Sequence, residues 1–112
     1  MPRYVNVIHM MPETDEGLEV VAIVEVPDAI DDVYNALEYA FRWTQNLEGS
    51  WSRDDLPNNP DRNPNVIVKG NLPVHNGKTY GMRSTSVGDL MVLNGGPDTY
   101  KVARFGFEKV ER

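Results

Sequence analysis

Two apolar runs near the N-terminus have the pattern of β-strands. Residues 3–10 (RYVNVIHM) alternate apolar and polar side chains, and residues 19–26 (EVVAIVEV) have almost no polar interruption. Alternation is typical of a half-buried strand, whereas a continuous apolar run is typical of a central strand. The acidic loop between them ends near Gly17, which favours an antiparallel hairpin. Pro27 cannot donate a backbone hydrogen bond and is predicted to close the second strand.

A helix is predicted directly after Pro27. Asp28 is placed as the N-cap, and Asp31 and Asp32 follow in the first turn, where the positive end of the helix dipole favours them. Apolar residues then recur at three- and four-residue spacing, which gives one face of a helix running to about Asn46. These residues are Ile30, Val33, Tyr34, Leu37, Ala40 and Phe41.

The segment from residue 47 to residue 64 breaks this regularity. It combines Gly49 with several prolines and asparagines, so neither a continuous helix nor a strand is predicted there. A connection of this length is uncommon in a small domain unless it is functional or disordered. The sequence therefore predicts a long Asn/Pro-rich loop.

The C-terminal half has strand and turn signals in close succession. Residues 65–70 predict a short strand that residues 72–74 continue after a bend, and residues 75–78 (HNGK) predict a turn. Residues 90–93 (LMVL) form a continuous apolar run, as expected of a strand buried on both faces.

The chain is predicted to end in a hairpin with an extension. Residues 94–98 (NGGPD) favour a tight turn, and residues 100–107 are rich in aromatic and β-branched side chains. Gly106 is placed where a β-bulge would re-aim the side chains of this strand. In order, the elements predict a single α+β domain over residues 1–112, β-β-α-loop-β-β-β, with one main helix packed on a mostly antiparallel sheet.

Composition and charge narrow the functional classes. The chain has no cysteine, which excludes disulfides and thiolate chemistry and leaves the redox compartment open. The N-terminus has no basic–apolar–cleavage pattern and no apolar run approaches the roughly 20 residues of a membrane span, so a cytoplasmic protein without a membrane partner is predicted. The net charge is −6, made of −9 in residues 1–56 and +3 in residues 57–112. An acidic half argues against wrapping of nucleic acid by the whole surface, and it fits an acidic face that meets a basic partner.

The residues that could carry chemistry do not form a recognisable constellation. The two histidines, His9 and His75, lack metal-ligand spacing, and His9 alternates with valines as a buried strand residue would, so no metal or cofactor is predicted. Ser84 and Ser86 have no glycine elbow around them, and their hydroxyls are predicted to bond local backbone. Asp89 is predicted to pair with Arg83 across the loop as architecture. No catalytic residue is assigned, and a non-enzymatic protein is predicted.

Aromatic and cationic side chains suggest a contact surface instead. Trp43 follows the apolar helix face and is predicted to lie in the core, whereas Trp51 lies in the long loop beside Arg53. Tryptophan and arginine are common anchors of protein interfaces. The predicted surface combines Trp51 and Arg53 with the Arg83–Asp89 loop, including Ser84 and Ser86.

The C-terminal stretch RSTSVGDLMVL…YKVARFGFEKV resembles the YodL-like domain, a small module of Firmicutes proteins, mobile elements and large polyvalent phage or plasmid proteins. The matching positions are Arg83, Ser84, Ser86, Val87, Asp89, Tyr100, Val102, Gly106, Phe107 and Val110. The resemblance covers about a quarter of the chain and implies an accessory protein of a mobile element, with a role in interaction or counter-defence. Gly88 stands where the family often has serine.

Three functional hypotheses follow. The first is a phage or mobile-element protein that binds and modulates a host macromolecule, most simply a protein, in a bacterial cytoplasm. The second is a nucleic-acid-binding module similar to small PUA-like barrels, which would use the basic C-terminal half. Its contact residues would be Lys69, Lys78, Arg83, Lys101 and Arg104. The third is an acidic mimic of a DNA phosphate array.

Overall fold

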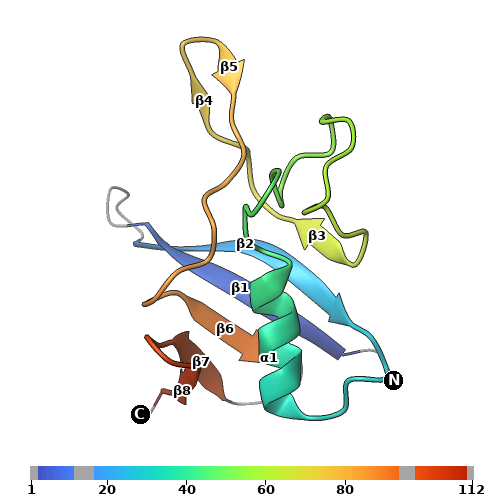
Figure 1. Cartoon of the computed structure of the whole chain (residues 1–112). Helices are drawn as coiled ribbons and strands as arrows, with labels where there is room; N and C mark the ends of the chain where they lie inside the picture. Colours follow the sequence, from blue (N-terminus) through green and yellow to red (C-terminus); the bar gives the residue numbers. More distant parts are fainter. Residues whose placement is uncertain (1–2, 12–16, 94–97, 111–112) are drawn as a thin grey trace.

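The chain folds around one sheet crossed by one helix (Figure 1). The computed structural model describes residues 3–11, 17–93 and 98–110. Its strands are β1 (Arg3–Met11), β2 (Gly17–Val26), β3 (Val66–Val68), β4 (Val74–His75), β5 (Lys78–Thr79), β6 (Leu90–Leu93), β7 (Thr99–Val102) and β8 (Phe107–Lys109), and its helix is α1 (Val33–Arg42).

Six of the described strands form one antiparallel sheet in the order β3-β2-β1-β6-β7-β8. The predicted N-terminal hairpin is present, because β1 and β2 pair from Arg3–Val26 to Met11–Gly17. The remaining strands, β4 and β5, pair with each other in a hairpin that projects away from the sheet (Figure 1). The prediction of a single α+β domain with one helix on a mostly antiparallel sheet is confirmed.

One face of the sheet, here called the inner face, carries the core. Val5 and Val7 of β1 lie opposite Val24 and Ala22 of β2, and Met91 of β6 pairs with Val7 on the other side. All five residues are fully buried. The helix covers this face with its own buried residues, which are Ala36, Leu37 and Ala40. Trp51, which follows the helix, joins the same core.

The opposite face, here called the outer face, is also apolar. A residue's direct partner on the next strand points to the same face, so the register defines this face. Its apolar members are Tyr4, Ile8, Met10, Leu18, Val20, Ile23, Ile67, Leu90 and Val92. None of them belongs to the core cluster or packs against it among the described residues. The prediction that residues 90–93 are buried on both faces is therefore wrong: Met91 is buried, but Leu90 and Val92 are only half-buried.

The helix is shorter than predicted at both ends. Asp32, not Asp28, is the N-cap: its Oδ2 accepts from the Asn35 backbone N–H at 3.2 Å. Residues 27–30 form a turn instead, closed by a bond from Ile30 N–H to the Pro27 carbonyl at 3.0 Å. The helix ends at Arg42, and the next residues bond the 82–85 segment rather than continuing the helix, as in the bond from Thr85 N–H to the Thr44 carbonyl at 3.0 Å.

Two glycine-containing turns shape the second half. Asn76 and Gly77 have φ values of 52° and 76°, as a two-residue type I′ hairpin requires, which confirms the predicted turn at residues 75–78. Residues 72–74 do not continue β3, because β4 pairs with β5.

Gly106 has a φ of 78° but does not form the predicted bulge. It closes a turn in which Ala103 N–H donates to the Gly106 carbonyl at 2.9 Å, and β8 pairs back on β7. The predicted turn at residues 94–98 lies largely outside the described residues.

Candidate functional site

Asp89 is the hub of the loop that sequence analysis singled out. Its buried carboxylate accepts two bonds from the Arg83 guanidinium, at 2.7 and 2.8 Å, so the predicted Arg83–Asp89 pair is present. It also accepts from the backbone N–H of Met10 at 2.9 Å and of Ser86 at 2.8 Å. Burial by itself raises the pKa of Asp89, but these bonds outweigh burial and hold the pKa below its usual value. The carboxylate thus fastens the loop to β1.

A chain of buried polar groups continues from this hub. His9 Nε2 lies 2.9 Å from Thr85 Oγ1, which donates to Thr44 Oγ1 at 2.8 Å. Thr44 Oγ1 donates in turn to the Ala40 carbonyl at 2.8 Å. Because both hydroxyl hydrogens are used in this direction, His9 must donate its Nε2–H to Thr85. Burial lowers the pKa of His9 to about 4, which keeps the imidazole neutral. We call His9, Thr44, Arg83, Thr85 and Asp89 the Asp89 junction.

The junction contains a hydroxyl, an imidazole and a carboxylate, but their geometry is not that of a catalytic triad. In a triad the hydroxyl and the carboxylate bond opposite ring nitrogens, and the imidazole accepts the hydroxyl proton. Here Thr85 and Asp89 both face Nε2, at 2.9 and 3.9 Å, and the ring donates to the hydroxyl. His9 Nδ1 is buried without a hydrogen-bond partner among the described residues. The arrangement is suited to hold the loop, not to activate a nucleophile.

The long Asn/Pro-rich loop is built around two side chains. Asp61 Oδ2 accepts from three successive backbone N–H groups, those of residues 47–49, at 2.8, 2.8 and 2.6 Å. Asn59 donates to the Ser50 carbonyl at 2.6 Å and accepts from the Ser50 N–H at 3.0 Å. Burial by itself raises the pKa of Asp61, but the backbone bonds outweigh it and lower the pKa. As predicted, residues 47–64 contain no helix or strand.

Trp51 is fully buried, so the expectation that it lies on an exposed contact surface is not met. Its Nε1–H donates to the Arg83 carbonyl at 2.9 Å, and its ring meets the His9 ring edge-on at 6.2 Å between centroids. Ser52 Oγ accepts from the Met82 N–H at 2.7 Å. These contacts join the long loop to the segment before Asp89. The two loops do lie together, but the tryptophan that joins them faces the core.

The other predicted contact residues are engaged within their loops. Arg53 pairs with Asp55 at 2.5 Å. Ser84 Oγ accepts from the Asn46 N–H at 2.8 Å, and Ser86 Oγ donates to the Ser84 carbonyl at 3.2 Å. Ser86 therefore bonds local backbone, as predicted, whereas Ser84 bonds the backbone of Asn46, 38 positions away, which the prediction of a local bond did not include. Arg53, Arg83 and the two serines retain some exposed surface, but these bonds fix their polar groups in the loop architecture.

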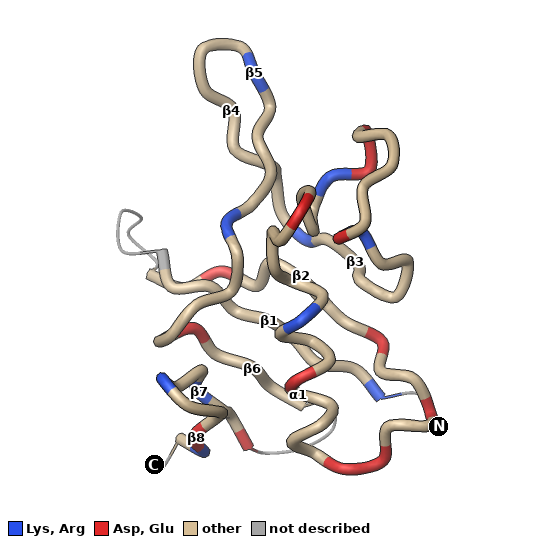
Figure 2. The backbone as a smooth tube through the Cα atoms, in the orientation of Figure 1, with Lys and Arg blue, Asp and Glu red and all other residues tan. Residues whose placement is uncertain are grey.

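The basic residues of the nucleic-acid hypothesis are spread over the molecule. Lys69 follows β3 at one end of the sheet order, whereas Lys101 on β7 and Arg104 in the β7–β8 turn lie toward the other end. Lys78 is on the separate β4–β5 hairpin. Figure 2 shows the cations distributed in this way. Among the described strands, β3 and β8 end an open sheet, so these residues do not share the groove of a closed barrel.

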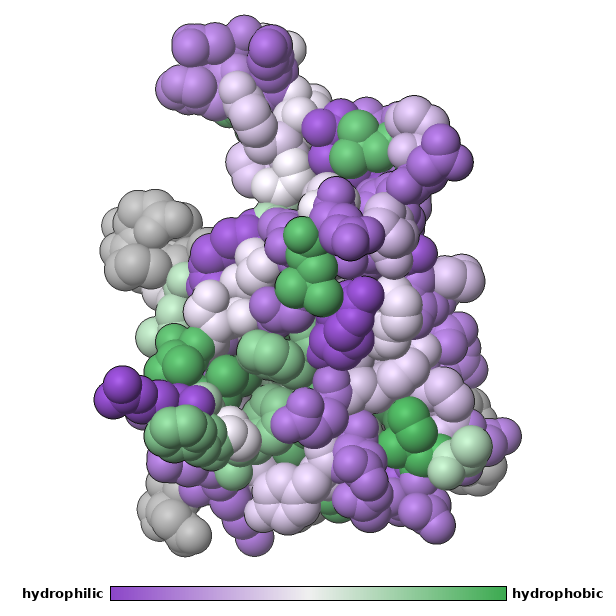
Figure 3. Space-filling model, viewed as in Figure 1, coloured by the Kyte–Doolittle hydropathy of each residue, from purple (hydrophilic) through white to green (hydrophobic). Residues whose placement is uncertain are grey.

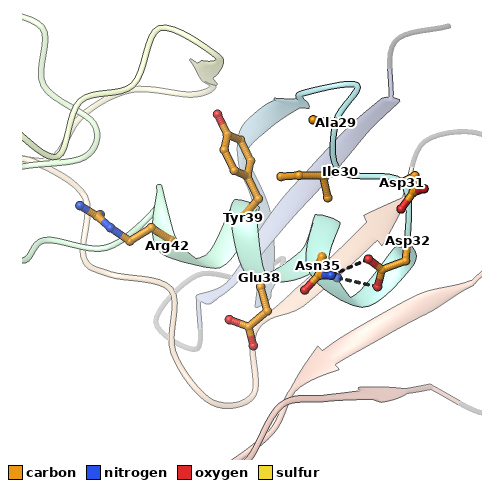
Figure 4. A pocket seen from close by; sticks show the side chains of 8 residues that line it. All are labelled: Ala29, Ile30, Asp31, Asp32, Asn35, Glu38, Tyr39 and Arg42. Carbon is orange, nitrogen blue, oxygen red and sulfur yellow. Dashed lines mark hydrogen bonds between the residues drawn. The ribbon is translucent and has the colours of Figure 1, made fainter.

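An open groove of about 440 Å³ runs along α1, and Asp31, Asp32 and Glu38 are among the residues that line it (Figure 4). Asp31 and Asp32 lie at the start of the helix, and Arg42 lies toward its end. Glu38 and Tyr39 line the groove between these ends (Figure 4).

An exposed apolar surface at the end of the sheet was not predicted from the sequence. Phe105, in the β7–β8 turn, has 90% of its surface exposed, and Val87 has 64%. The bond from Gly88 N–H to the Val102 carbonyl, at 2.8 Å, holds the Val87 loop beside this turn. A pocket of about 140 Å³ lies between α1 and the β7–β8 turn. We call this surface the corner patch; it consists of Phe41, Val87, Ala103, Arg104, Phe105 and Phe107.

Figure 3 shows apolar surface gathered where α1 approaches β7 and β8. The Phe41 and Phe107 rings meet edge-to-face there, at 6.1 Å between centroids. Phe105 lies outside the sheet because the chain turns at Gly106 instead of forming a bulge. In the sequence, the glycine was compatible with such a turn, but its neighbours continued the strand pattern.

Among the described residues, no three His, Cys, Asp or Glu side chains lie together as ligands for a metal ion. Within the same ranges, no helix has the length and hydropathy of a membrane-spanning segment. No protein-family model matches the chain, and neither the curated proteins nor the solved structures contain a match.

Proposed function

We propose that this chain is a small non-enzymatic accessory protein that acts by binding a host protein through the corner patch. The observation that carries the proposal is Phe105, a large aromatic side chain with 90% of its surface exposed in a turn between two strands. Exposed aromatic side chains next to arginine are typical anchors of protein interfaces, and Arg104 is the neighbour of Phe105.

The corner patch is held in place before any partner binds. The turn is closed by the bond between Ala103 and Gly106, and the Phe41–Phe107 contact supports it from below. Binding by a fixed turn loses less conformational entropy than binding by a segment that must first become ordered. The 140 Å³ pocket, lined by the sequence neighbours of Phe105, Arg104 and Gly106, offers room for an apolar side chain of the partner.

Charge favours a protein over a nucleic acid as the partner. The chain has a net charge of −6, and phosphate contacts need clustered cations. The nucleic-acid hypothesis keeps one specific observation in its favour, because Arg104 beside an exposed Phe105 is a pair that can stack on a base. It is therefore retained as the second candidate.

The resemblance to the YodL-like domain is part of the same proposal. The motif residues Arg83, Ser84, Ser86 and Asp89 are engaged in hydrogen bonds that hold their loop, and Gly106 occupies a turn. A motif made of such residues implies a fold shared with the YodL-like domain, but it does not identify the binding partner. We accordingly propose an origin in a phage or mobile element and action in the cytoplasm of a bacterial host.

Affinity capture from bacterial lysate, with and without nuclease treatment, tests the class of partner. A protein that stays bound after nuclease treatment is the expected result. Loss of all captured material on nuclease treatment would transfer the proposal to nucleic acid. In that case, binding of labelled oligonucleotides should weaken steeply as salt is added.

A further inference from the structure

The pocket of about 140 Å³ in the corner patch, here called the corner pocket, combines apolar walls with polar groups at its rim. Its walls are the apolar residues Phe41, Val102, Ala103 and Phe107. Arg104 and Gly106 line it from the β7–β8 turn, and Glu38 lines it from α1. A cavity of about 150 Å³ holds a molecule of the size of benzene, so the corner pocket has room for one apolar side chain such as leucine.

The backbone of the β7–β8 turn presents hydrogen-bond donors beside the corner pocket. The N–H groups of Arg104, Phe105 and Gly106 form no hydrogen bond with any other described residue. Ala103 N–H donates to the Gly106 carbonyl, but the Gly106 N–H does not bond back. Gly106 has a φ of 78°, whereas the φ of Phe105 is negative. Successive N–H groups in turns of this kind make concave sites that bind anions.

The N–H of Phe107 is also directed away from the sheet. Its cross-strand partner is Val102. Val102 N–H donates to the Asp89 carbonyl, and the Val102 carbonyl accepts from Gly88 N–H, both at 2.8 Å. Because both backbone groups of Val102 face the segment before β6, Val102 and Phe107 form a non-hydrogen-bonded pair of the ladder. The Phe107 N–H therefore continues the row of donors from the turn into β8.

Arg104 adds a cation to these donors. Its guanidinium forms no ion pair within the part of the chain that the structure describes, whereas Arg53 and Arg62 each pair with an aspartate. A Cβ atom added to Gly106 would have no described atom within 4 Å apart from its chain neighbours, so the turn is open to a ligand. An arginine beside open backbone N–H groups is complementary to a carboxylate.

We propose that the corner pocket binds the C-terminus of the host protein, with the terminal carboxylate on the turn donors and Arg104 and the last side chain inside the pocket. Arg104 and Gly106 both line the pocket and supply donors, so the anion and the apolar group must lie close together in the ligand. An apolar C-terminal residue carries both on one Cα atom, whereas an internal Asp or Glu residue has no apolar side chain there. Backbone N–H groups capture C-terminal carboxylates in other peptide-binding proteins. This assignment rests on the function proposed above, since it names the part of the host protein that the corner patch binds.

Two further residues orient the bound chain. Glu38 lines the helix side of the pocket and repels a carboxylate, so the terminal carboxylate lies toward the turn. The Glu38 carboxylate can accept a hydrogen bond from the N–H of the terminal residue instead. Phe105 follows Arg104 in the same turn, and its exposed ring is available to the residues that precede the C-terminus.

Nuclear magnetic resonance titration of the full chain with short peptides tests the proposal. The probe is an acetylated tetrapeptide that ends in leucine with a free carboxylate. The comparison peptides are its C-terminal amide and the same peptide ending in glycine. The backbone amide signals of residues 103–107 should shift and saturate with the leucine acid. The two comparison peptides should bind at least about tenfold more weakly, because one lacks the charge and the other lacks the side chain.

Arg104→Gln should weaken binding of the leucine acid about tenfold and leave the weaker binding of the amide unchanged. Lys101→Gln is the matched control and should bind as the wild type does. Lys101 is an exposed cation of β7 that pairs with Leu90 on the outer face, and it does not line the pocket. Each variant is first checked for the dispersed spectrum of a folded domain.

Equal binding of the leucine acid and its amide by the wild type would overturn the proposal, even where a variant fails to fold. Equal binding of the leucine and glycine acids, or no binding of any peptide at millimolar concentration, would overturn it as well. Any of these results together with Phe105-dependent capture of a host protein would leave the proposed function standing. Binding of the leucine acid together with capture that does not depend on Phe105 would support the carboxylate site and remove the proposed function.

Discussion

The Asp89 junction and the corner patch lie on neighbouring loops at one end of the sheet, yet they are built in opposite ways. In the junction, every polar side chain except Arg83 is buried, and each is hydrogen-bonded to another, as Asp89 is to Arg83. In the corner patch, apolar side chains are exposed, as Phe105 is. The polar groups of the junction form hydrogen bonds within the protein, whereas the patch exposes apolar side chains to solvent.

This difference separates stability from recognition. Buried, bonded polar groups resist removal because their partners would be left unsatisfied, and they offer a partner nothing to hold. An exposed aromatic ring contributes little to folding and much to an interface. Substitutions in the junction should therefore lower the free energy of unfolding, and substitutions in the patch should lower binding alone.

The largest effect is expected from Trp51→Ala, which removes the ring that joins the long loop to the junction. Truncating a buried tryptophan leaves a cavity and should lower the free energy of unfolding by about 4 kcal/mol. Urea denaturation followed by circular dichroism measures the change. Tyr80→Ala, at a half-exposed aromatic residue outside both regions, is the control and should change stability by less than about 1 kcal/mol. Equal stability of both variants would show that Trp51 is not a core residue.

Asp89→Ala should have the next largest effect, at about 3 kcal/mol. The substitution leaves the Met10 and Ser86 N–H groups and the Arg83 guanidinium without their shared acceptor. The same denaturation experiment applies. Asp98→Ala is the matched control, because Asp98 pairs with Lys109 at the surface and such pairs contribute less than about 1 kcal/mol. Equal losses of unfolding free energy in Asp89→Ala and Asp98→Ala would contradict the structural role of Asp89.

The pH dependence of the free energy of unfolding should show the protonation of His9. Its folded pKa of about 4 lies below the unfolded value of 6.5, so the unfolded state binds the proton first as pH falls. The contribution of neutral His9 is complete above pH 6.5 and is lost progressively down to about pH 4, at up to about 1.4 kcal/mol per pH unit. His9→Gln, which keeps a donor without titrating, should flatten the curve in this window. An unchanged curve in the variant would assign the loss to other groups.

Local pattern was enough to predict the framework of the fold. The hairpin of β1 and β2, the helix and the open Asn/Pro-rich loop depend on periodicity and turn residues, which neighbours in sequence determine. The helix start was displaced because Asp28 and Asp32 are equally good caps in isolation, and only Asp32 meets the Asn35 N–H.

The candidate site was less predictable because its contacts join distant segments. His9 and Thr85 are 76 positions apart, and the Trp51 ring is buried only because its loop folds back on the Arg83 segment. A tryptophan in a loop gives no local sign of its burial. Phe105 was missed for the converse reason, since its neighbours have a strand pattern and the reversal of direction at Gly106 is what exposes it.

The smallest effect on stability is expected in the corner patch. Phe105→Ala should change the free energy of unfolding by less than about 0.5 kcal/mol, because the ring is almost entirely in solvent already. Thermal melting of the variant beside the wild type measures this. A loss of several kcal/mol would mean that Phe105 belongs to the core and would remove it from the binding surface.

The most direct test of recognition by the corner patch is quantitative capture of partners from nuclease-treated bacterial lysate by the wild type, Phe105→Ala and Tyr80→Ala. The account predicts that the wild type and Tyr80→Ala recover the same protein in similar amounts. Phe105→Ala, although folded, should recover at least tenfold less, as expected for the loss of an aromatic anchor. Equal recovery by all three proteins would contradict the assignment of the binding surface to the corner patch.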